Sequence, residues 1–292
     1  MKYRLLQWFW NFVSLIPLRV MYVLSDGLFY PLYYLIRYRR KIVRKNLSES
    51  FPEKSLPEIL KIEKRFYRFF ADIIFEMFKM ATISKKGMSR RMKFTNIETI
   101  NAVLQQGKSI SLYMGHYGNW EWVSSMPLHL NRAAVPGQIY SRLRNKAVNK
   151  LLIHNRERMG AICIEMKETA RKITEFINNK QVSIIGFIAD QSPAREDIRH
   201  YVPFLNHHTP TLVGTEKLTK RHGFEAWYLN VKQLKRGYYE AEFIRMHENP
   251  QSLPNFELTD IYFRHLEQTI LQQPELYLWT HNRFKFAQKI DV

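Results

Sequence analysis

The chain has 292 residues, of which 46% are hydrophobic, and this is enough for one large domain with a buried core. The formal charge of +19 predicts an anionic partner: nucleic acid, an anionic membrane surface, an acidic carrier protein or a phosphorylated substrate. The single cysteine, Cys163, excludes an intramolecular disulfide framework and a cysteine-based metal cluster, and its apolar neighbours predict a buried structural thiol.

The first 36 residues are unusually apolar. Two stretches, residues 5–17 and 28–36, are each too short for a simple spanning helix, which needs roughly 20 apolar residues. Their Trp and Tyr side chains suit the headgroup zone of a bilayer, so we expect an interfacial or shallowly inserted helical anchor. The alternative is a hydrophobic helical hairpin that packs on the main domain. No small-residue cleavage site follows, so we do not expect a removable signal peptide.

A basic run follows at residues 37–45, with Arg37, Arg39, Arg40, Lys41, Arg44 and Lys45. Beside an apolar segment such a run predicts contact with anionic lipid, where each basic residue near the surface contributes about 1 kcal/mol. On a soluble protein the same run would be a solvated helix face. We therefore predict a membrane-associated anchor over residues 1–45 and a main domain over residues 46–292.

Residues 55–83 have the pattern of one amphipathic helix. Ser55 and Glu58 form the sequence of a capping box, and apolar residues then recur at helical spacing as far as Ile74. Gly87 is expected at the junction with the next element.

From about residue 94 onward, apolar β-favouring runs alternate with helical stretches. We predict strands at residues 109–114, 135–140, 161–164 and 182–188, with helices near 143–158 and 167–179. Thr209 and Pro210 predict the start of a helix that ends near Gly223. Two further strands, 224–231 and 238–244, flank a turn at 235–237. The alternation predicts an α/β fold: a mostly parallel sheet with helices on both faces.

The segment 112–121 carries the clearest chemical signal. Its buried strand ends at Gly115, which places His116 in a turn at the carboxyl end of the strand, where open α/β sheets bind ligands. Gly115 and Gly118 allow a sharp turn and a close approach to substrate. On one regular helix, positions 116 and 121 would be about 500° apart and would not share a face. His116 and Glu121 meet if the histidine lies in the turn and the glutamate in the first helical turn.

A carboxylate on one ring nitrogen fixes the tautomer of a histidine and leaves the other nitrogen free to accept a proton. Such a pair activates a hydroxyl directly, without a nucleophilic Ser or Cys. We therefore predict that His116 is a general base and that Glu121 orients it. The spacing alone allows a structural histidine that caps a helix equally well.

The stretch 115–121, Gly-His-Tyr-Gly-Asn-Trp-Glu, resembles the signature block of the bacterial lipid A biosynthesis acyltransferases of the late lauroyl/myristoyl type. These belong to the wider lysophospholipid and glycerol-phosphate acyltransferases, which carry a His-x4-Asp/Glu pair. The resemblance extends over nearly the whole chain. The other matching positions are Pro17, Leu18, Arg19, Ser25, Asp26, Arg44, Lys45, Asn46, Leu47, Phe51, Pro52, Arg142, Asn145, Arg156, Gly160, Ala189, Asp190, Gln191, Val202, Pro203, Phe204, Pro274, Tyr277, Trp279, His281, Arg283 and Phe284.

The resemblance implies a glycerol-phosphate-acyltransferase-like α/β domain preceded by membrane-associated helices, on the cytoplasmic face of the bacterial inner membrane. It implies an acyltransferase that moves a fatty acyl chain from an acyl thioester, carried by acyl carrier protein, to a hydroxyl of a lipid A precursor or similar glycolipid. The alternative acceptors are another membrane glycolipid or a lysophospholipid. Neither a cofactor nor a metal is expected.

The predicted site follows from the motif and the resemblance together. The catalytic residues are His116 and Glu121, and the substrate-binding residues are Gly118, Asn119, Arg142, Asn145, Arg156, Asp190 and Gln191. Backbone amides near Gly118, or Arg142, are expected to hold the oxyanion, and the positive end of the following helix is expected to keep His116 unprotonated. Asp190 and Gln191 also end an apolar strand, and their alternative role is a helix or turn cap. In the middle block, Leu143 follows Arg142 where the family often has proline, so which neighbouring arginine faces the site stays open.

Two other classes of function, nucleic-acid binding and hydrolysis, fit the sequence less well. Nucleic-acid binding would explain the charge, but the sequence has no zinc pattern, no RNA-recognition aromatic motif and no helix-turn-helix. A hydrolase of the Gly-x-Ser-x-Gly type lacks its nucleophile motif here.

Overall fold

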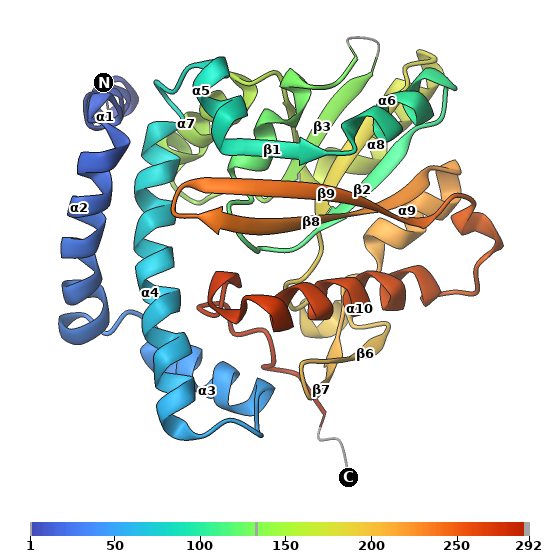
Figure 1. The fold of residues 1–292 in the computed structure, drawn as a ribbon. Helices are drawn as coiled ribbons and strands as arrows, with labels where there is room; N and C mark the ends of the chain where they lie inside the picture. Colours follow the sequence, from blue (N-terminus) through green and yellow to red (C-terminus); the bar gives the residue numbers. More distant parts are fainter. Residues whose placement is uncertain (1, 132–133, 289–292) are drawn as a thin grey trace.

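A seven-stranded sheet organises the part of the chain that the computed structural model describes, residues 2–131 and 134–288 (Figure 1). The strand order is β1-β9-β8-β2-β5-β3-β4. The strands are β1 (Met92–Thr95), β2 (Ile110–Met114), β3 (Val135–Tyr140), β4 (Ile162–Glu165), β5 (Ser183–Ile188), β8 (Glu225–Lys235) and β9 (Tyr238–His247). Each neighbouring pair is parallel except β8 and β9, which form an antiparallel hairpin. The predicted mostly parallel sheet is confirmed.

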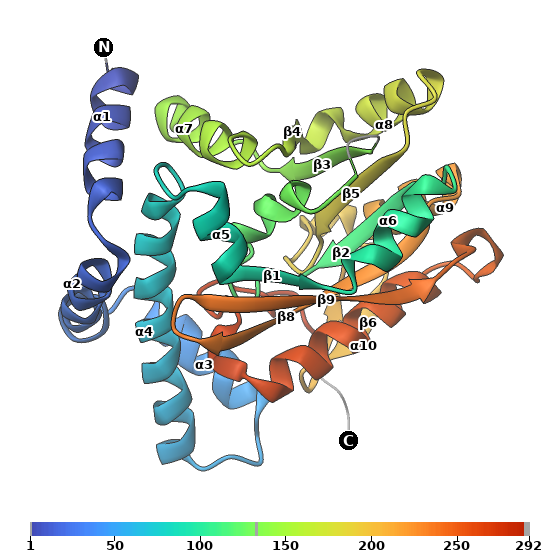
Figure 2. The ribbon, with the colours of Figure 1, turned by 45° about the horizontal axis from the view of Figure 1, so that its top comes forward.

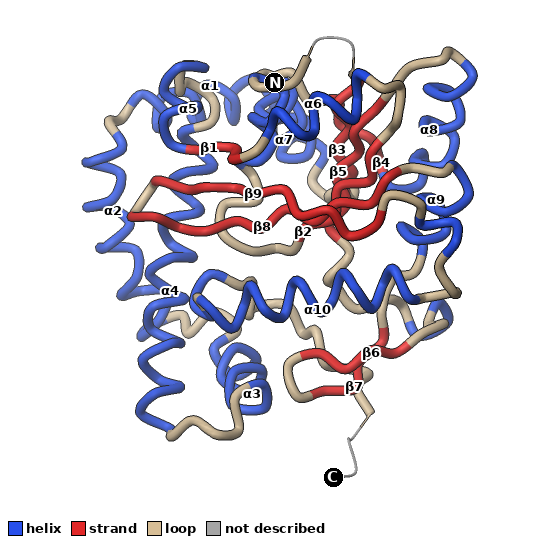
Figure 3. The backbone as a smooth tube through the Cα atoms, turned by 45° about the vertical axis from the view of Figure 1, so that its right-hand side comes forward, coloured by secondary structure: helices blue, strands red, loops and turns tan. Residues whose placement is uncertain are grey.

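Helices lie on both faces of this sheet. On one side α10 packs on β8 and β9, and on the other side α5 and α6 pack on β9 (Figures 1 and 3). Figure 2 shows α7 and α8 beside the β3–β4 edge. The α-helices are α1 (Lys2–Leu15), α2 (Leu18–Tyr30), α3 (Arg40–Ser50), α4 (Leu56–Lys79), α5 (Lys85–Arg91), α6 (Ile97–Gln105), α7 (Lys146–Glu157), α8 (Thr169–Asn178), α9 (Gly214–His222) and α10 (Glu257–Gln272).

Short elements complete the described fold. Strands β6 (Tyr201–Phe204) and β7 (His207–Pro210) form a separate antiparallel pair. A π-helix, η1 (Pro31–Leu35), follows α2. The short 3₁₀ helices are η2 (Trp122–Leu128), η3 (Met166–Glu168), η4 (Arg195–Asp197), η5 (Pro250–Ser252) and η6 (Pro274–Leu276).

The local sequence signals were mostly right. The capping box forms at the start of α4, where the Ser55 backbone N–H donates to the Glu58 carboxylate at 2.8 Å. Gly223 ends α9 in the left-handed conformation, as a C-terminal glycine should. Two predictions were wrong. Gly87 lies inside α5 rather than at a junction, and Thr209 and Pro210 belong to β7, so that α9 begins only at Gly214. Pairing with β6 outweighs the helix-start pattern there.

The N-terminal helices contribute to the main core. Met21, Phe29, Tyr33, Val43 and Leu47 are buried in the same apolar cluster as the strands of the sheet. Helix α2 lies along α4, and α1 contacts the same helix in a different direction (Figure 1). The predicted boundary at residue 45 therefore does not separate two cores, and for α2 the packed hairpin describes the structure better than a detached anchor.

The outward faces of α1 and α2 are apolar and exposed, including Leu5, Trp8, Phe12, Val20 and Val23. Among the described residues no single helix is long and apolar enough to cross a membrane. Residues 3–15 and 18–35 meet that criterion only as a pair, which is bent by 107°.

The basic run at residues 37–45 makes several contacts inside the protein. The guanidinium of Arg44 binds the buried Glu63 carboxylate at 2.8 and 3.0 Å, and Arg40 approaches the same carboxylate at 3.3 Å. Arg39 donates to the carbonyl of Thr280. These three residues therefore tie α3 to α4 and to the C-terminal segment, rather than presenting a free basic face.

Candidate active site

Two parallel strands bring the central residues together. β2 and β5 are neighbours in register, with Met114 opposite Ile188, so their carboxyl ends meet at one edge of the sheet. His116 and Asp190 each lie two residues beyond these ends. His116 Nδ1 is 2.6 Å from Asp190 Oδ1, and the His116 backbone N–H donates to Asp190 Oδ2 at 2.9 Å. Asp190 therefore binds both the ring and the backbone of His116.

The environment of Asp190 favours its carboxylate form. Burial opposes its ionisation, but the His116 ring and the hydrogen bonds from His116 hold the pKa of the carboxyl below its ordinary value. Because an ionised carboxylate only accepts, Nδ1 carries a proton, so that Nε2 is the acceptor nitrogen of the neutral ring. The His116 side chain is 19% exposed, and the Gln191 amide nitrogen lies 3.4 Å from Nε2. The His116 ring is thus partly open to solvent, and its Nε2 lies beside Gln191.

The C-terminal segment holds the loop that carries His116, residues 115–121, which we call the histidine loop. Leu278 N–H donates to the His116 carbonyl at 3.0 Å, and Gly118 N–H donates to the Leu276 carbonyl at 3.1 Å. Gly118 has a φ of +59°, and a Cβ there would lie 2.8 Å from Val231. Glycine is therefore required for the turn, as predicted. The Gly118 amide, however, is already bonded within the protein, so the structure does not offer it to an oxyanion.

The structure corrects the predicted partner of His116. Glu121 forms a two-point ion pair with Arg156, with Nε–Oε2 at 2.9 Å and Nη2–Oε1 at 2.6 Å. The carboxylate on His116 Nδ1 belongs to Asp190 instead. The segment after His116 forms a loop and then the short η2, so no regular α-helix carries Glu121 back to the ring or points its N-terminus at His116. Glu121 instead joins the histidine loop to α7, which carries Arg156.

The other predicted substrate-binding residues lie in different places. Asn119 is buried, and its amide donates to Glu76 at 2.6 Å while its carbonyl oxygen accepts from the Trp122 N–H. Asn145 caps α7 by accepting from the backbone N–H groups of residues 147 and 148. Arg142 is exposed on the loop between β3 and α7. Of the nine predicted site residues, Asp190 contacts Nδ1 of the His116 ring and Gln191 lies beside Nε2.

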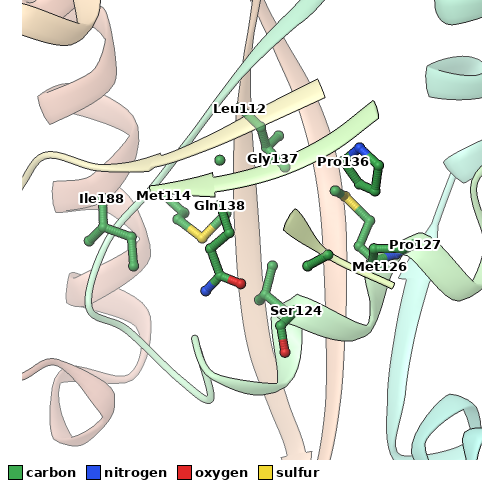
Figure 4. A pocket seen from close by; sticks show the side chains of 12 residues that line it. Leu112, Met114, Ser124, Met126, Pro127, Pro136, Gly137, Gln138 and Ile188 are labelled. Carbon is green, nitrogen blue, oxygen red and sulfur yellow. The ribbon is translucent and has the colours of Figure 1, made fainter. Parts of the chain in front are cut away.

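An apolar pocket adjoins this group (Figure 4). Its cavity volume is small, about 20 Å³, and Met114 and Ile188, the last residues of β2 and β5, line it. Leu112, Met126, Pro136 and Ala161 contribute further apolar surface, while Ser124 and Gln138 supply polar atoms. The pocket therefore begins two residues from each member of the His116–Asp190 pair.

Sequence reasoning placed Asp190 in the site but did not assign it to His116. Both residues directly follow an apolar strand, and that shared position was the available signal. The predicted site did not include two more residues near Asp190, His281 and Arg283. His281 accepts a hydrogen bond from the Ser192 N–H, and burial lowers its pKa to about 4, so it is neutral at pH 7. Arg283 is 1% exposed and donates to Thr209 Oγ1 at 2.8 Å.

Cys163 lies half-buried in β4. Burial raises the pKa of its thiol to about 12, so the thiol is protonated at neutral pH. A protonated thiol is a poor nucleophile, and this agrees with the structural role predicted for it.

Comparisons with known proteins point to one family. The family model described as bacterial lipid A biosynthesis acyltransferase matches residues 3–286. A protein of Haemophilus influenzae named lipid A biosynthesis acyltransferase is 22% identical over 246 residues, covering 82% of this chain and 74% of its own length. Since the family model spans nearly the whole chain, this protein belongs to the bacterial lipid A biosynthesis acyltransferase family and is an acyltransferase.

Proposed function

We propose that the protein transfers a fatty acyl chain from an acyl thioester on acyl carrier protein to a hydroxyl of a lipid A precursor or a similar glycolipid. The observation that carries this proposal is the His116–Asp190 pair, which follows the two strands whose last residues line an apolar pocket. The pair offers a base for a hydroxyl, and the apolar side chains that line the pocket lie beside it. The +19 charge suits both an acidic carrier and a phosphorylated acceptor.

In the proposed reaction, Nε2 of His116 removes the proton of the acceptor hydroxyl as its oxygen bonds to the thioester carbonyl carbon. Asp190 holds Nδ1–H and stabilises the imidazolium that forms. Collapse of the tetrahedral intermediate breaks the carbon–sulfur bond. The proton on Nε2 then passes to the departing thiolate, giving an ester and a free thiol. The transfer needs no acyl-enzyme intermediate.

The developing oxyanion needs a donor, and the Gly118 amide is already bonded. The side-chain amide nitrogen of Gln191 lies 3.4 Å from Nε2 of His116 and is a donor beside it. We assign it to the carbonyl oxygen of the thioester, a role in which one donor contributes roughly 10²–10³ in turnover.

We further propose that the enzyme works at the cytoplasmic face of the bacterial inner membrane. The exposed apolar faces of α1 and α2 support this location, because Trp and Phe side chains there suit a headgroup boundary.

Purified protein with labelled acyl carrier protein and candidate acceptors tests the proposal, with products identified by mass spectrometry. A new ester on the glycolipid, lost in His116→Ala, is the expected result. Transfer only to a lysophospholipid would show that the proposed glycolipid acceptor is wrong. Activity only with an acyl coenzyme A would show that the proposed donor is wrong. Equal turnover in wild type and His116→Ala would overturn the role of the histidine.

A further inference from the structure

A hollow lies at the tip of the β8–β9 hairpin, away from the histidine site. It has a volume of about 430 Å³ and is lined by Arg90, Lys93, Leu234, Lys235, Tyr238 and Tyr239. These residues come from α5, β1 and the two hairpin strands, which are distant in the sequence. The fold therefore brings together three cationic side chains, those of Arg90, Lys93 and Lys235.

The hollow carries an excess of positive charge, although Glu240 lies opposite Lys93 in the pairing of β1 with β9. Residues 79–93 contain six basic residues, Lys79, Lys85, Lys86, Arg90, Arg91 and Lys93, and no Asp or Glu. Arg90, Lys93 and Lys235 are exposed, and within residues 2–131 and 134–288 none of the three forms an ion pair. Several positive charges so close together attract an anion.

Aromatic and backbone contacts hold the hairpin tip in place. The Tyr238 ring lies between Arg91 and Lys235, with the guanidinium carbon at 4.6 Å and the ammonium at 4.5 Å from its centroid. Arg91 also donates to the Gly237 carbonyl at 3.0 Å. Arg236 binds the Asp72 carboxylate at 2.6 and 2.8 Å. The turn that carries Lys235 is therefore held in place by contacts on both sides of the hairpin.

The tip lies beside α4 and contacts α2 (Figures 1 and 2). A Cβ on Gly237 would lie 1.9 Å from the Tyr22 hydroxyl oxygen, and Arg236 also binds Asp26 of α2 at 2.8 and 3.0 Å. The same helix exposes Val20 and Val23 on its outward face. Cations beside an apolar membrane-facing helix lie at the depth of lipid phosphates.

We propose that this hollow binds the phosphate group of a membrane lipid, an inference that rests on the membrane location given under the proposed function. The expected ligand is a phosphate ester held by guanidinium and ammonium groups. The basic run at 37–45 is less suited, because Arg40 and Arg44 are bound to Glu63.

The hollow is separate from the reacting atoms. Tyr228 of β8 is paired with Tyr113 of β2, and Lys235 lies seven residues further along the hairpin, which is on the order of 20 Å at the rise of a strand. The phosphate therefore orients or recruits a lipid and takes no part in the transfer. It belongs either to an anionic phospholipid or to the acceptor glycolipid itself.

The test compares two triple variants with the same change in charge. The first is Arg90→Gln with Lys93→Gln and Lys235→Gln. The matched control is Lys167→Gln with Lys217→Gln and Arg221→Gln, three exposed cations on η3 and α9, far from the hairpin tip. Thermal unfolding of both variants confirms that each is folded.

One arm measures sedimentation with neutral phosphatidylcholine vesicles and with vesicles that also contain phosphatidylglycerol. The other measures turnover of a phosphorylated glycolipid in neutral detergent. If the ligand is a phospholipid, the first variant binds the anionic vesicles roughly 10²-fold more weakly at low salt and binds neutral vesicles normally. This factor follows because each lost cation costs about 1 kcal/mol and about 1.4 kcal/mol corresponds to a tenfold change in affinity. If the ligand is the phosphate of the acceptor, the KM of the first variant for the phosphorylated glycolipid rises at least several-fold, and its kcat is unchanged.

Wild-type behaviour of the first variant in both arms would overturn the proposal. An equal loss in the control would also overturn it, because the effect would then reflect net charge. The vesicle arm needs no turnover, so failure of the proposed acyl transfer leaves this test intact.

Discussion

At the level of single residues, two carboxylates lie near the histidine loop, and they have different tasks. Asp190 contacts the imidazole ring, whereas Glu121 neutralises Arg156. Burial opposes the charge on Arg156, but the Glu121 carboxylate outweighs it and raises the pKa of the guanidinium. The two roles lead to opposite expectations for stability and turnover.

Asp190→Asn should lower kcat by at least ~10²-fold, within the range of general-base contributions, with only a small change in unfolding temperature. The amide can still contact Nδ1, but it does not stabilise imidazolium. Mass-spectrometric turnover and calorimetry on the same preparation measure both effects. Near-normal kcat in the folded variant would contradict the assignment of Asp190.

Glu121→Gln should instead destabilise the fold, because it leaves Arg156 charged and largely buried, at a cost of up to about 5 kcal/mol. The double variant Glu121→Met with Arg156→Met removes both charges and should recover most of that loss. Denaturant unfolding of the single and double variants measures the free energy of unfolding of each. If Glu121→Gln abolished turnover with unchanged stability, Glu121 would belong to the chemistry after all.

Arg283 is a buried cation between the rings of Phe204 and Phe263, with Nε and Nη2 unbonded among the described residues. Burial lowers its pKa, and its charge helps to keep the pKa of Asp190 low. Arg283→Met should therefore leave stability unchanged or raise it, since hydrophobic replacement of a buried charge is often tolerated.

The same variant should move the acid limb of kcat/KM to higher pH. Loss of a nearby positive charge makes protonation of the His116–Asp190 pair easier, so the pair loses its extra proton at a higher pH. Arg283→Lys, which keeps the charge, should retain the wild-type limb. A purely structural arginine predicts the reverse: lower stability in Arg283→Met and an unmoved limb.

At the level of elements, the sequence predicted those parts whose signals are local. The β8–β9 hairpin, the capping box of α4 and the strand before His116 each follow from a short pattern. The partner of His116 did not, because Asp190 is 74 residues away and reaches it only through the pairing of β2 with β5. The β7 strand was missed for a related reason, since its partner β6 is recognisable only in the folded chain.

Glu76 of α4 connects several elements at once. Its carboxylate accepts from Tyr22 of α2 at 2.7 Å, from Tyr239 of β9 at 2.9 Å and from Asn119 of the histidine loop at 2.6 Å. Burial raises the pKa of Glu76 from 4.5 to about 7. The folded protein thus keeps this proton at pH values where the unfolded chain has released it.

Between pH 4.5 and 7 the folded state binds more protons at Glu76, so its stability should fall as the pH rises, by on the order of 3 kcal/mol. Glu76→Gln cannot titrate and should flatten that slope. Denaturant unfolding at pH 5, 6, 7 and 8 compares the two proteins. Parallel pH profiles would show that Glu76 is ionised throughout this range.

At the level of the whole molecule, the apolar N-terminus has two roles that the sequence alone did not separate. One face of α2 is core, with Met21 and Phe29 buried and Ser25 bonded to Asp72 at 2.6 Å. The opposite face, with the outer face of α1, is exposed. Hydrophobicity predicts that such helices bury apolar surface, but it does not say whether protein or lipid covers each side.

These two roles are separable by experiment. Replacing the exposed Leu5, Trp8 and Phe12 by Gln should leave the unfolding temperature unchanged, since each is more than half exposed. The variant should bind neutral vesicles at least ~10²-fold more weakly, because each such side chain contributes roughly 1.5 kcal/mol or more when buried. Removal of residues 1–36 should instead unfold the protein, because α4 and the hairpin tip lose the partners of Asp72, Glu76 and Arg236. Vesicle sedimentation and calorimetry distinguish the two outcomes. A stable, active protein without residues 1–36 would restore the detached anchor, and normal vesicle binding by the Gln variant would move the membrane contact elsewhere.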